Sequence, residues 1–153
     1  MFKNSDFSGE LSNSIEVGKV IGGQKTHGVG FTDVSDEEFK TEMQHSLASS
    51  RLLAKRNKAE YELTSKIHTT IPLFDNYVYV DARYILVDRR TGKIIFDEKI
   101  KSKSSLPRGA TLKVATYDLQ VGSQEDTMAR NIGAMRANID KFLEKLSHLK
   151  LIE

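Results

Sequence analysis

The first alternation of apolar and polar positions along the chain begins after residue 13. Ile15, Val17 and Ile21 lie among polar or small residues with nearly the two-residue period of a half-buried strand. Residues 1–13 are mostly polar and rich in Ser and Asn. We therefore expect a flexible lead-in over 1–13 and a single domain over 14–150.

A capping signal and a 3.6-residue period predict a helix next. Ser35 and Glu38 can bond the free amides of a first helical turn, and Val34 can pack on Phe39 as a hydrophobic staple. The apolar positions that recur at helical spacing are Phe39, Met43, Leu47 and Leu53. The polar side chains expected to point elsewhere are Lys40, Glu42 and Gln44. We expect the helix to end near Ala54.

Three further strands are predicted between residues 61 and 100. The first is closed by Pro72, and its apolar positions are Tyr61, Leu63, Ile67 and Ile71. The apolar face of the second consists of Val78, Val80, Ala82, Tyr84 and Leu86. Residues 88–92 form a turn signal in which Gly92 can adopt a positive φ. The returning strand carries Ile94, Phe96 and Ile100, so the last two strands should form a hairpin.

The carboxy-terminal third contains one ambiguous segment and one clear helix. Residues 111–121 have enough β-branched residues for a strand and enough Leu and Ala for a helix, and we favour an extended segment ending at Gly122. Ser123 can cap the following helix together with Asp126. The apolar stripe of that helix is Met128, Ile132, Met135, Ile139, Phe142, Leu146 and Leu149. We expect this stripe to pack on the sheet and not to form a coiled-coil seam.

The predicted order is β-α-β-β-β-α, which indicates an α+β fold. An antiparallel β-sheet of about four strands has one apolar face to cover, and two amphipathic helices are the elements available to cover it. Both helices are therefore expected on one face of the sheet. The opposite face is expected to be open.

Composition limits the classes of partner and of chemistry. The 153 residues carry a net charge of only +2, which excludes a strongly basic nucleic-acid arm or an acidic tail. The absence of cysteine removes disulfides, thiolate catalysis and thiolate-ligated metals. The first ten residues lack the apolar stretch of a signal peptide, and no window approaches the length of a membrane span.

No residue pattern specifies a reaction. Gly18 and Gly23 have the spacing of a phosphate-binding loop, but Gln24 intervenes before Lys25 and Thr26. The capping box places the helix start about ten residues further on, so we interpret this stretch as a connecting loop. The histidines, which show no metal-ligand spacing, are His27, His45, His68 and His148. We expect no catalytic residue, no metal and no cofactor; an enzyme whose groups converge from distant positions remains the alternative.

The open sheet face is the candidate interaction surface. By strand alternation its residues are Lys66, His68, Tyr77, Tyr79, Arg83, Lys99, Lys101 and Lys103. A solvated face whose lysines discourage edge pairing is one interpretation. A surface that binds an acidic protein, an anionic lipid or a nucleic acid is the other, although the small net charge makes a nucleic acid the weaker choice.

Four segments resemble small bacterial envelope lipoproteins: SIEVGKVIGG, FKTEMQHSLASSRLLA, YVDARYILVDRRTGKIIFDEKI and MARNIGAMRANIDKFLEKL. The similarity covers about residues 14–147. Its most specific parts are Gly22-Gly23, the turn at 88–92, and Gly133-Ala134 with Arg136, Asn138 and Ile139. In outline these proteins are similar to the auxiliary lipoproteins of ABC transporters and to the lipopolysaccharide-assembly lipoprotein.

The resemblance implies a periplasmic domain, at the inner surface of the outer membrane or elsewhere in the periplasm, with a non-catalytic role in an envelope complex. Some of the resembling proteins carry the name UDP-N-acetylglucosamine acyltransferase. Such enzymes resemble left-handed helices built from hexapeptide repeats, and no such repeat occurs here. We therefore expect a protein partner, and membrane association only through a lipid anchor that this chain does not contain.

Overall fold

The computed structural model describes residues 2–22, 36–70, 78–104, 111–114, 117–120 and 126–151. Its helices and strands are β1 (Ile15–Ile21), α1 (Asp36–Ser49), β2 (Tyr61–Thr70), β3 (Val78–Asp88), β4 (Ile94–Ser104), β5 (Thr111–Val114), β6 (Tyr117–Gln120) and α2 (Asp126–Ser147). The α+β class is confirmed. Several expected features fall outside the described residues: the loop with Lys25 and Thr26, the caps at Ser35 and Ser123, Val34, Pro72 and Tyr77.

The main sheet has the strand order β1-β2-β3-β4. β3 pairs antiparallel with both β2 and β4, so the expected hairpin is confirmed, and Gly92 in its turn has a φ of 72°. β1, however, pairs parallel with β2. The sheet is therefore mixed and not wholly antiparallel as expected. A parallel pair needs a long crossover, and the segment that contains α1 supplies it.

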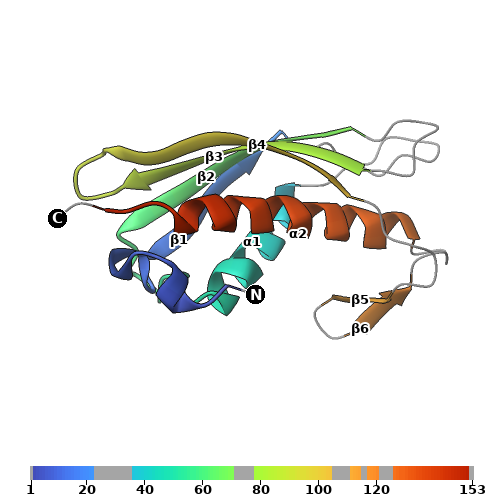
Figure 1. The fold of residues 1–153 in the computed structure, drawn as a ribbon, viewed down its shortest axis with the longest axis horizontal. Helices are drawn as coiled ribbons and strands as arrows, with labels where there is room; N and C mark the ends of the chain where they lie inside the picture. The colour runs from blue at the N-terminus through green and yellow to red at the C-terminus, as the bar shows by residue number, and fades with distance from the viewer. Residues whose placement is uncertain are drawn as a thin grey trace.

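Both helices lie on one side of this sheet (Figure 1). α2 packs on β3 and β4, while α1 packs on β1 and on α2. The α2 side chains buried at this interface include Ile132, Met135, Ile139, Phe142 and Leu146. The sheet side chains buried with them include Leu63, Ile67, Val80, Ala82, Tyr84, Leu86, Phe96 and Ile100. The expectation that the α2 stripe packs on the sheet is confirmed.

α1 ends earlier than expected because the chain turns left-handed at Arg51, whose φ is 57°. The amide of Leu52 donates to the carbonyl of Leu47 at 2.8 Å, and the amide of Arg51 donates to that of Ala48 at 3.0 Å. These two bonds are a Schellman ending, which satisfies carbonyls that the helix leaves free. Leu53, expected on the helix, instead bridges to Ile15 of β1.

The segment before β1 contributes to the core. Asn4–Asp6 and Gly9–Leu11 are short 3-10 helices, and the side chains of Phe7 and Leu11 are buried. The Ser14 hydroxyl donates to the carbonyl of Glu10 at 2.8 Å. Residues 1–13 were expected from their polar composition to be a flexible lead-in. They contain two apolar side chains, Phe7 and Leu11, that pack inside the domain.

β5 and β6 form a separate two-stranded antiparallel sheet, so the extended conformation favoured for residues 111–121 is confirmed at these strands. β6 contacts α2. In Figure 1 this hairpin lies near the beginning of α2, away from the four-stranded sheet. The hairpin therefore does not cover the outer face of that sheet.

A buried polar cluster holds α2 on the sheet. The side-chain amide nitrogen of Asn138 lies 3.0 Å from the carbonyl oxygens of Val80 and Ile100 and 2.9 Å from the Ser102 hydroxyl. Tyr84 donates its hydroxyl proton to the amide oxygen of Asn138. Burial raises the pKa of Tyr84 well above its usual value, so this hydroxyl stays protonated and remains a donor. The cluster satisfies polar groups that water cannot reach.

Candidate functional site

The open face of the sheet collects cationic residues in rows that run across three strands. The register places Arg83 of β3 between Lys66 of β2 and Lys99 of β4. In the next row Asp81 lies between His68 and Lys101, and in the row after that Tyr79 lies opposite Lys103. The register thus brings most of the residues singled out from the sequence into neighbouring positions.

Arg83 is already paired on this face. Its guanidinium donates to both carboxylate oxygens of Asp97, at 2.8 Å and 2.7 Å. This bond, with the charge of Arg83 itself, holds the pKa of Asp97 below its usual value. Because Lys99 directly opposite is also a cation, Arg83 turns to the diagonal carboxylate. Arg83 is therefore less available to an anionic ligand than its sequence position suggests.

The lysines of this face are exposed, and three of them have no ion pair within the described part of the chain: Lys66, Lys99 and Lys101. At the end of the sheet near the β3–β4 turn the charges are balanced instead. There Arg89 contacts the carboxylates of Glu16 at 2.8 Å and Glu62 at 3.1 Å. The lysines without ion pairs therefore lie away from this balanced end.

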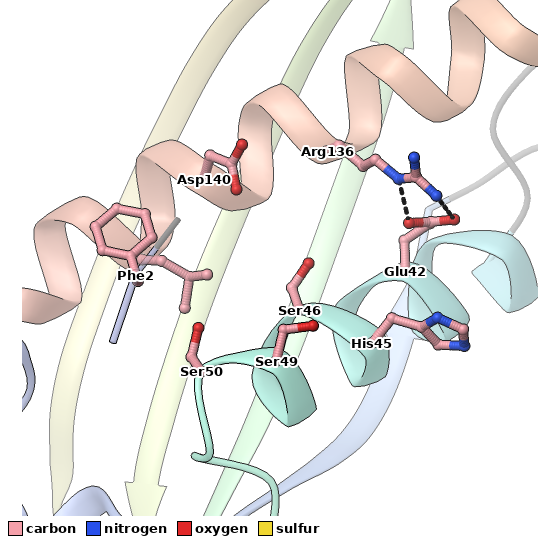
Figure 2. A pocket seen from close by; sticks show the side chains of 9 residues that line it. Phe2, Glu42, His45, Ser46, Ser49, Ser50, Arg136 and Asp140 are labelled. Atoms are coloured by element: carbon pink, nitrogen blue, oxygen red, sulfur yellow. Dashed lines mark hydrogen bonds and ion pairs between the residues drawn. The ribbon is translucent and has the colours of Figure 1, made fainter. Parts of the chain in front are cut away.

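A second concave region lies between the two helices on the other side of the molecule (Figure 2). This cleft has a volume of about 490 Å³. Its lining residues are Phe2, Glu42, His45, Ser46, Ser49, Ser50, Arg136, Asp140 and Leu143. At one end Arg136 of α2 donates to both carboxylate oxygens of Glu42 on α1, at 2.8 Å and 3.3 Å. This ion pair joins the two helices.

Further along the cleft, Asp140 lies one helical turn after Arg136. Burial raises the pKa of Asp140, although the positive charges of the amino-terminal ammonium group and of Arg136 oppose the shift. Figure 2 shows the hydroxyl groups of Ser46 on α1 and of Ser50, the residue directly after α1, pointing toward the gap between the helices. The ring of His45 points away from Asp140 in the same view. A carboxylate and hydroxyl groups can bind a cationic or hydrogen-bonding ligand here.

Sequence reasoning missed this cleft because it assigned Glu42 to the outward side of its helix. The Glu42 side chain is instead largely buried, at 10% exposure, because it faces α2. The spacing of polar residues along the two helices does carry a signal of this cleft. Glu42, Ser46, Ser49 and Ser50 recur at helical spacing beside the apolar stripe of α1, as Arg136, Asp140 and Leu143 do on α2.

Among the described residues, neither region assembles a recognised catalytic constellation. In the same part of the chain, no three His, Cys, Asp or Glu side chains lie together as a metal site requires. None of the described helices has the length and apolarity to cross a membrane. Of the predicted surface residues, Tyr77 and the side chain of His68 lie outside what the structure describes.

These elements define a two-layer α+β domain in which helices cover one face of a mixed sheet and leave the other open. No family model matches the sequence, and no curated protein matches it. Among solved structures, the hypothetical protein CT253 from Chlamydia trachomatis has 14% identity and a TM-score of 0.57. The similarity covers 90% of this chain and 97% of that one.

Two further solved structures share the fold. A dodecamer of a PelC variant from Paraburkholderia phytofirmans has 11% identity and a TM-score of 0.56, covering 92% of this chain and 91% of that one. A minor lipoprotein from Acinetobacter baumannii has 9% identity and a TM-score of 0.50, covering 88% and 90%. At these identities the likeness concerns the fold alone.

Proposed function

We propose that this chain is the folded domain of a bacterial envelope lipoprotein that acts by binding a protein partner and not by catalysis. Two lines support the lipoprotein assignment: the resemblance of the four sequence segments, and a fold shared with a minor lipoprotein. A lipid anchor would hold the domain at a membrane facing the periplasm. The fold shared with a dodecameric protein supports a role in an assembly.

The observation that carries the binding role is the open sheet face with its unpaired lysines. Lys66 projects from β2, and Lys99 and Lys101 project from β4, on either side of β3; none of the three makes an ion pair with a described carboxylate. Such a surface fits an acidic patch on a protein, since complementary charge raises the rate and specificity of docking. A nucleic acid fits less well, because Arg83 is committed to Asp97 and the net charge is small.

Site-specific photo-crosslinking in the source bacterium tests this proposal. A benzophenone amino acid replaces Lys99 or Lys101 on the open face, or exposed Thr41 on α1 as the matched control. We expect one and the same envelope protein to be cross-linked at positions 99 and 101 and to be absent at position 41. Fractionation of the same cells should recover the adduct with the envelope.

Charge reversal distinguishes a specific surface from incidental proximity. Lys66 lies on β2, one strand beyond Arg83 from Lys99, so Lys66→Glu changes the charge of the face without removing the crosslinker. This variant should abolish the adduct at position 99 if the lysines bind an acidic partner. Adducts to RNA or lipid in place of a protein would reject the proposal, and equal adducts from position 41 would reject the assignment of this face. Recovery of the protein in the cytoplasm would overturn the envelope location.

A further inference from the structure

We propose that an apolar stripe on the open sheet face docks an amphipathic helix of the protein partner, and that this helix carries carboxylates along one flank only. The diagonal stripe consists of Ile21, Thr64, Ile85, Val87 and Ile94. The inference rests on the proposed function, because it names the element of the partner that the open face receives. Three observations support it: the position of the exposed isoleucines, the side chains that connect them, and the unequal charge on the two sides of the stripe.

Both large hydrophobic side chains that are exposed in the described part of the chain lie on the open face. Ile21 is 41% exposed and Ile94 is 54% exposed. The register aligns Ile21 of β1 with Lys66 of β2, and Ile94 of β4 with Val87 of β3. Side chains of paired residues project to the same side of a sheet, so both isoleucines project from the face that carries Lys66.

Partly exposed side chains connect the two isoleucines. Thr64 of β2 lies diagonally next to Ile21, and the register pairs Thr64 with Ile85 of β3. Val87 follows Ile85 on the same face and pairs with Ile94. Thr64, Ile85 and Val87 are each partly exposed. The diagonal stripe therefore crosses all four strands and offers methyl groups along its whole length, and a continuous apolar patch of this kind is typical of an interaction site.

The length and position of the diagonal stripe suit a helix. Its ends are separated by about 14 Å across the strands and about 13 Å along them, which gives a span of about 20 Å. A helix rises about 1.5 Å per residue and follows this span with about 13 residues. The stripe lies on a face of the sheet, where the backbone of a partner finds no hydrogen bonds. A helix satisfies its own backbone groups, as α2 does on the covered face.

The charges beside the diagonal stripe set the orientation of the helix. On one side lie Lys66 and Lys99, which make no ion pair in the described part of the chain. On the other side, Arg89 contacts Glu16 at 2.8 Å and Glu62 at 3.1 Å, so the charges there are balanced. Carboxylates of the partner gain attraction on the lysine side only. The docked helix should therefore carry its acidic residues on the flank that faces Lys66 and Lys99.

Photo-crosslinking from the stripe, with mass-spectrometric mapping of the captured residues, tests this inference in the source bacterium. A benzophenone amino acid replaces Ile21, Ile94 or Lys99 in separate proteins. We expect all three positions to capture the same envelope protein. The residues captured from positions 21 and 94 should lie about 13 positions apart within one helix. A separation of about six positions would indicate an extended strand, and capture of different proteins would indicate no common element; either result overturns the proposal.

The sequence of the captured helix tests the charge argument. Asp or Glu should occur on the flank that adjoins the residue captured from position 99, and should be absent from the opposite flank. Carboxylates on both flanks, or on neither, would overturn the proposed orientation.

Two variants separate apolar contact from the charge of the face. Ile94→Gln keeps that charge but removes the apolar contact, so it should lower the yield of the adduct at position 99 at least fivefold. Ile94→Leu retains an apolar side chain and should keep the yield within twofold of the original. Because Ile94 is exposed, thermal melts should show both variants folded. An unchanged yield in Ile94→Gln, or an equal loss in Ile94→Leu, would overturn the role of the stripe.

The partner surface and the diagonal stripe fail in different ways. If position 99 of the otherwise unaltered protein captures no envelope protein, the proposed function fails and this inference falls with it. If position 99 captures a protein and positions 21 and 94 do not, the partner surface stands and the stripe is rejected.

Discussion

The two faces of the four-stranded sheet use polar side chains in opposite ways. On the covered face, Asn138 is fully buried, and its side-chain amide finds partners on β3 and β4. On the open face, the Arg83–Asp97 pair is well formed, but its side chains remain 41% and 32% exposed. Water can replace a lost partner on the open face and cannot do so on the covered one. Similar bonds should therefore have very different effects on stability.

The largest effect is expected from Asn138→Ala on the covered face. This change leaves the Tyr84 hydroxyl without its acceptor, takes one hydrogen bond each from the carbonyls of Val80 and Ile100, and opens a cavity. Each buried polar group left unsatisfied costs about 1–3 kcal/mol, so we expect a loss of about 3–5 kcal/mol in the free energy of unfolding. Urea denaturation measures it.

Tyr84→Phe is the control for this cluster. It removes one donor and keeps the ring, which stacks on Phe142 with centroids 4.3 Å apart. In a double-mutant cycle the two changes should be strongly non-additive, because each breaks the same hydrogen bond. Additive losses would mean that the hydrogen bond between the two side chains contributes nothing to stability.

Apolar truncation on the covered face should have the next largest effect. Val80→Ala and Ile139→Ala each leave a cavity between α2 and the sheet, and each should cost about 1–4 kcal/mol. Ile94→Ala is the matched control, because Ile94 lies on the same sheet but is 54% exposed. Thermal melts measure the three variants. Equal destabilisation by Ile94→Ala would contradict the assignment of the buried face.

The ion pair between the helices should have an intermediate effect. Arg136→Met leaves the largely buried Glu42 carboxylate without its partner, and we expect a cost of about 1–2 kcal/mol because solvent still reaches the cleft. Glu42→Gln in the Arg136→Met background removes the stranded charge and should restore part of the loss. If urea titrations show that the double variant is no more stable than Arg136→Met, the unpaired charge of Glu42 is not the cause of the lost stability.

Most of the fold could be predicted because its signals are local. The strand alternation of β2 to β4, the turn with Gly92 and the stripe of α2 are each contained in a short stretch of sequence. The pairing of β1 is not local. Whether β1 lies parallel or antiparallel to β2 depends on where the connection through α1 returns the chain, and no residue near Ile15 encodes that choice.

The end of α1 was missed for a related reason. Arg51 adopts a left-handed conformation that glycine or asparagine usually signals, so no residue type at this position marks the helix end. The cleft was missed because the partner of Glu42 lies 94 residues away on α2. Helical spacing showed that each helix carries a polar flank, but only the packing of α1 on α2 brings the two flanks together.

The smallest effect is expected from Arg83→Gln on the open face, where both partners are solvated and a surface ion pair contributes little. The contribution of the Arg83–Asp97 ion pair to the free energy of unfolding depends on pH in a defined direction. The folded-state pKa of Asp97 is lowered, so the stabilisation is present above the unfolded pKa of an aspartate and disappears as the pH falls through the folded pKa. The unfolding midpoints of wild type and variant should therefore differ slightly near neutrality and converge in acid. If Arg83→Gln lowers the unfolding midpoint near neutral pH as much as Asn138→Ala does, then exposure to solvent does not explain the difference between the open and the covered face.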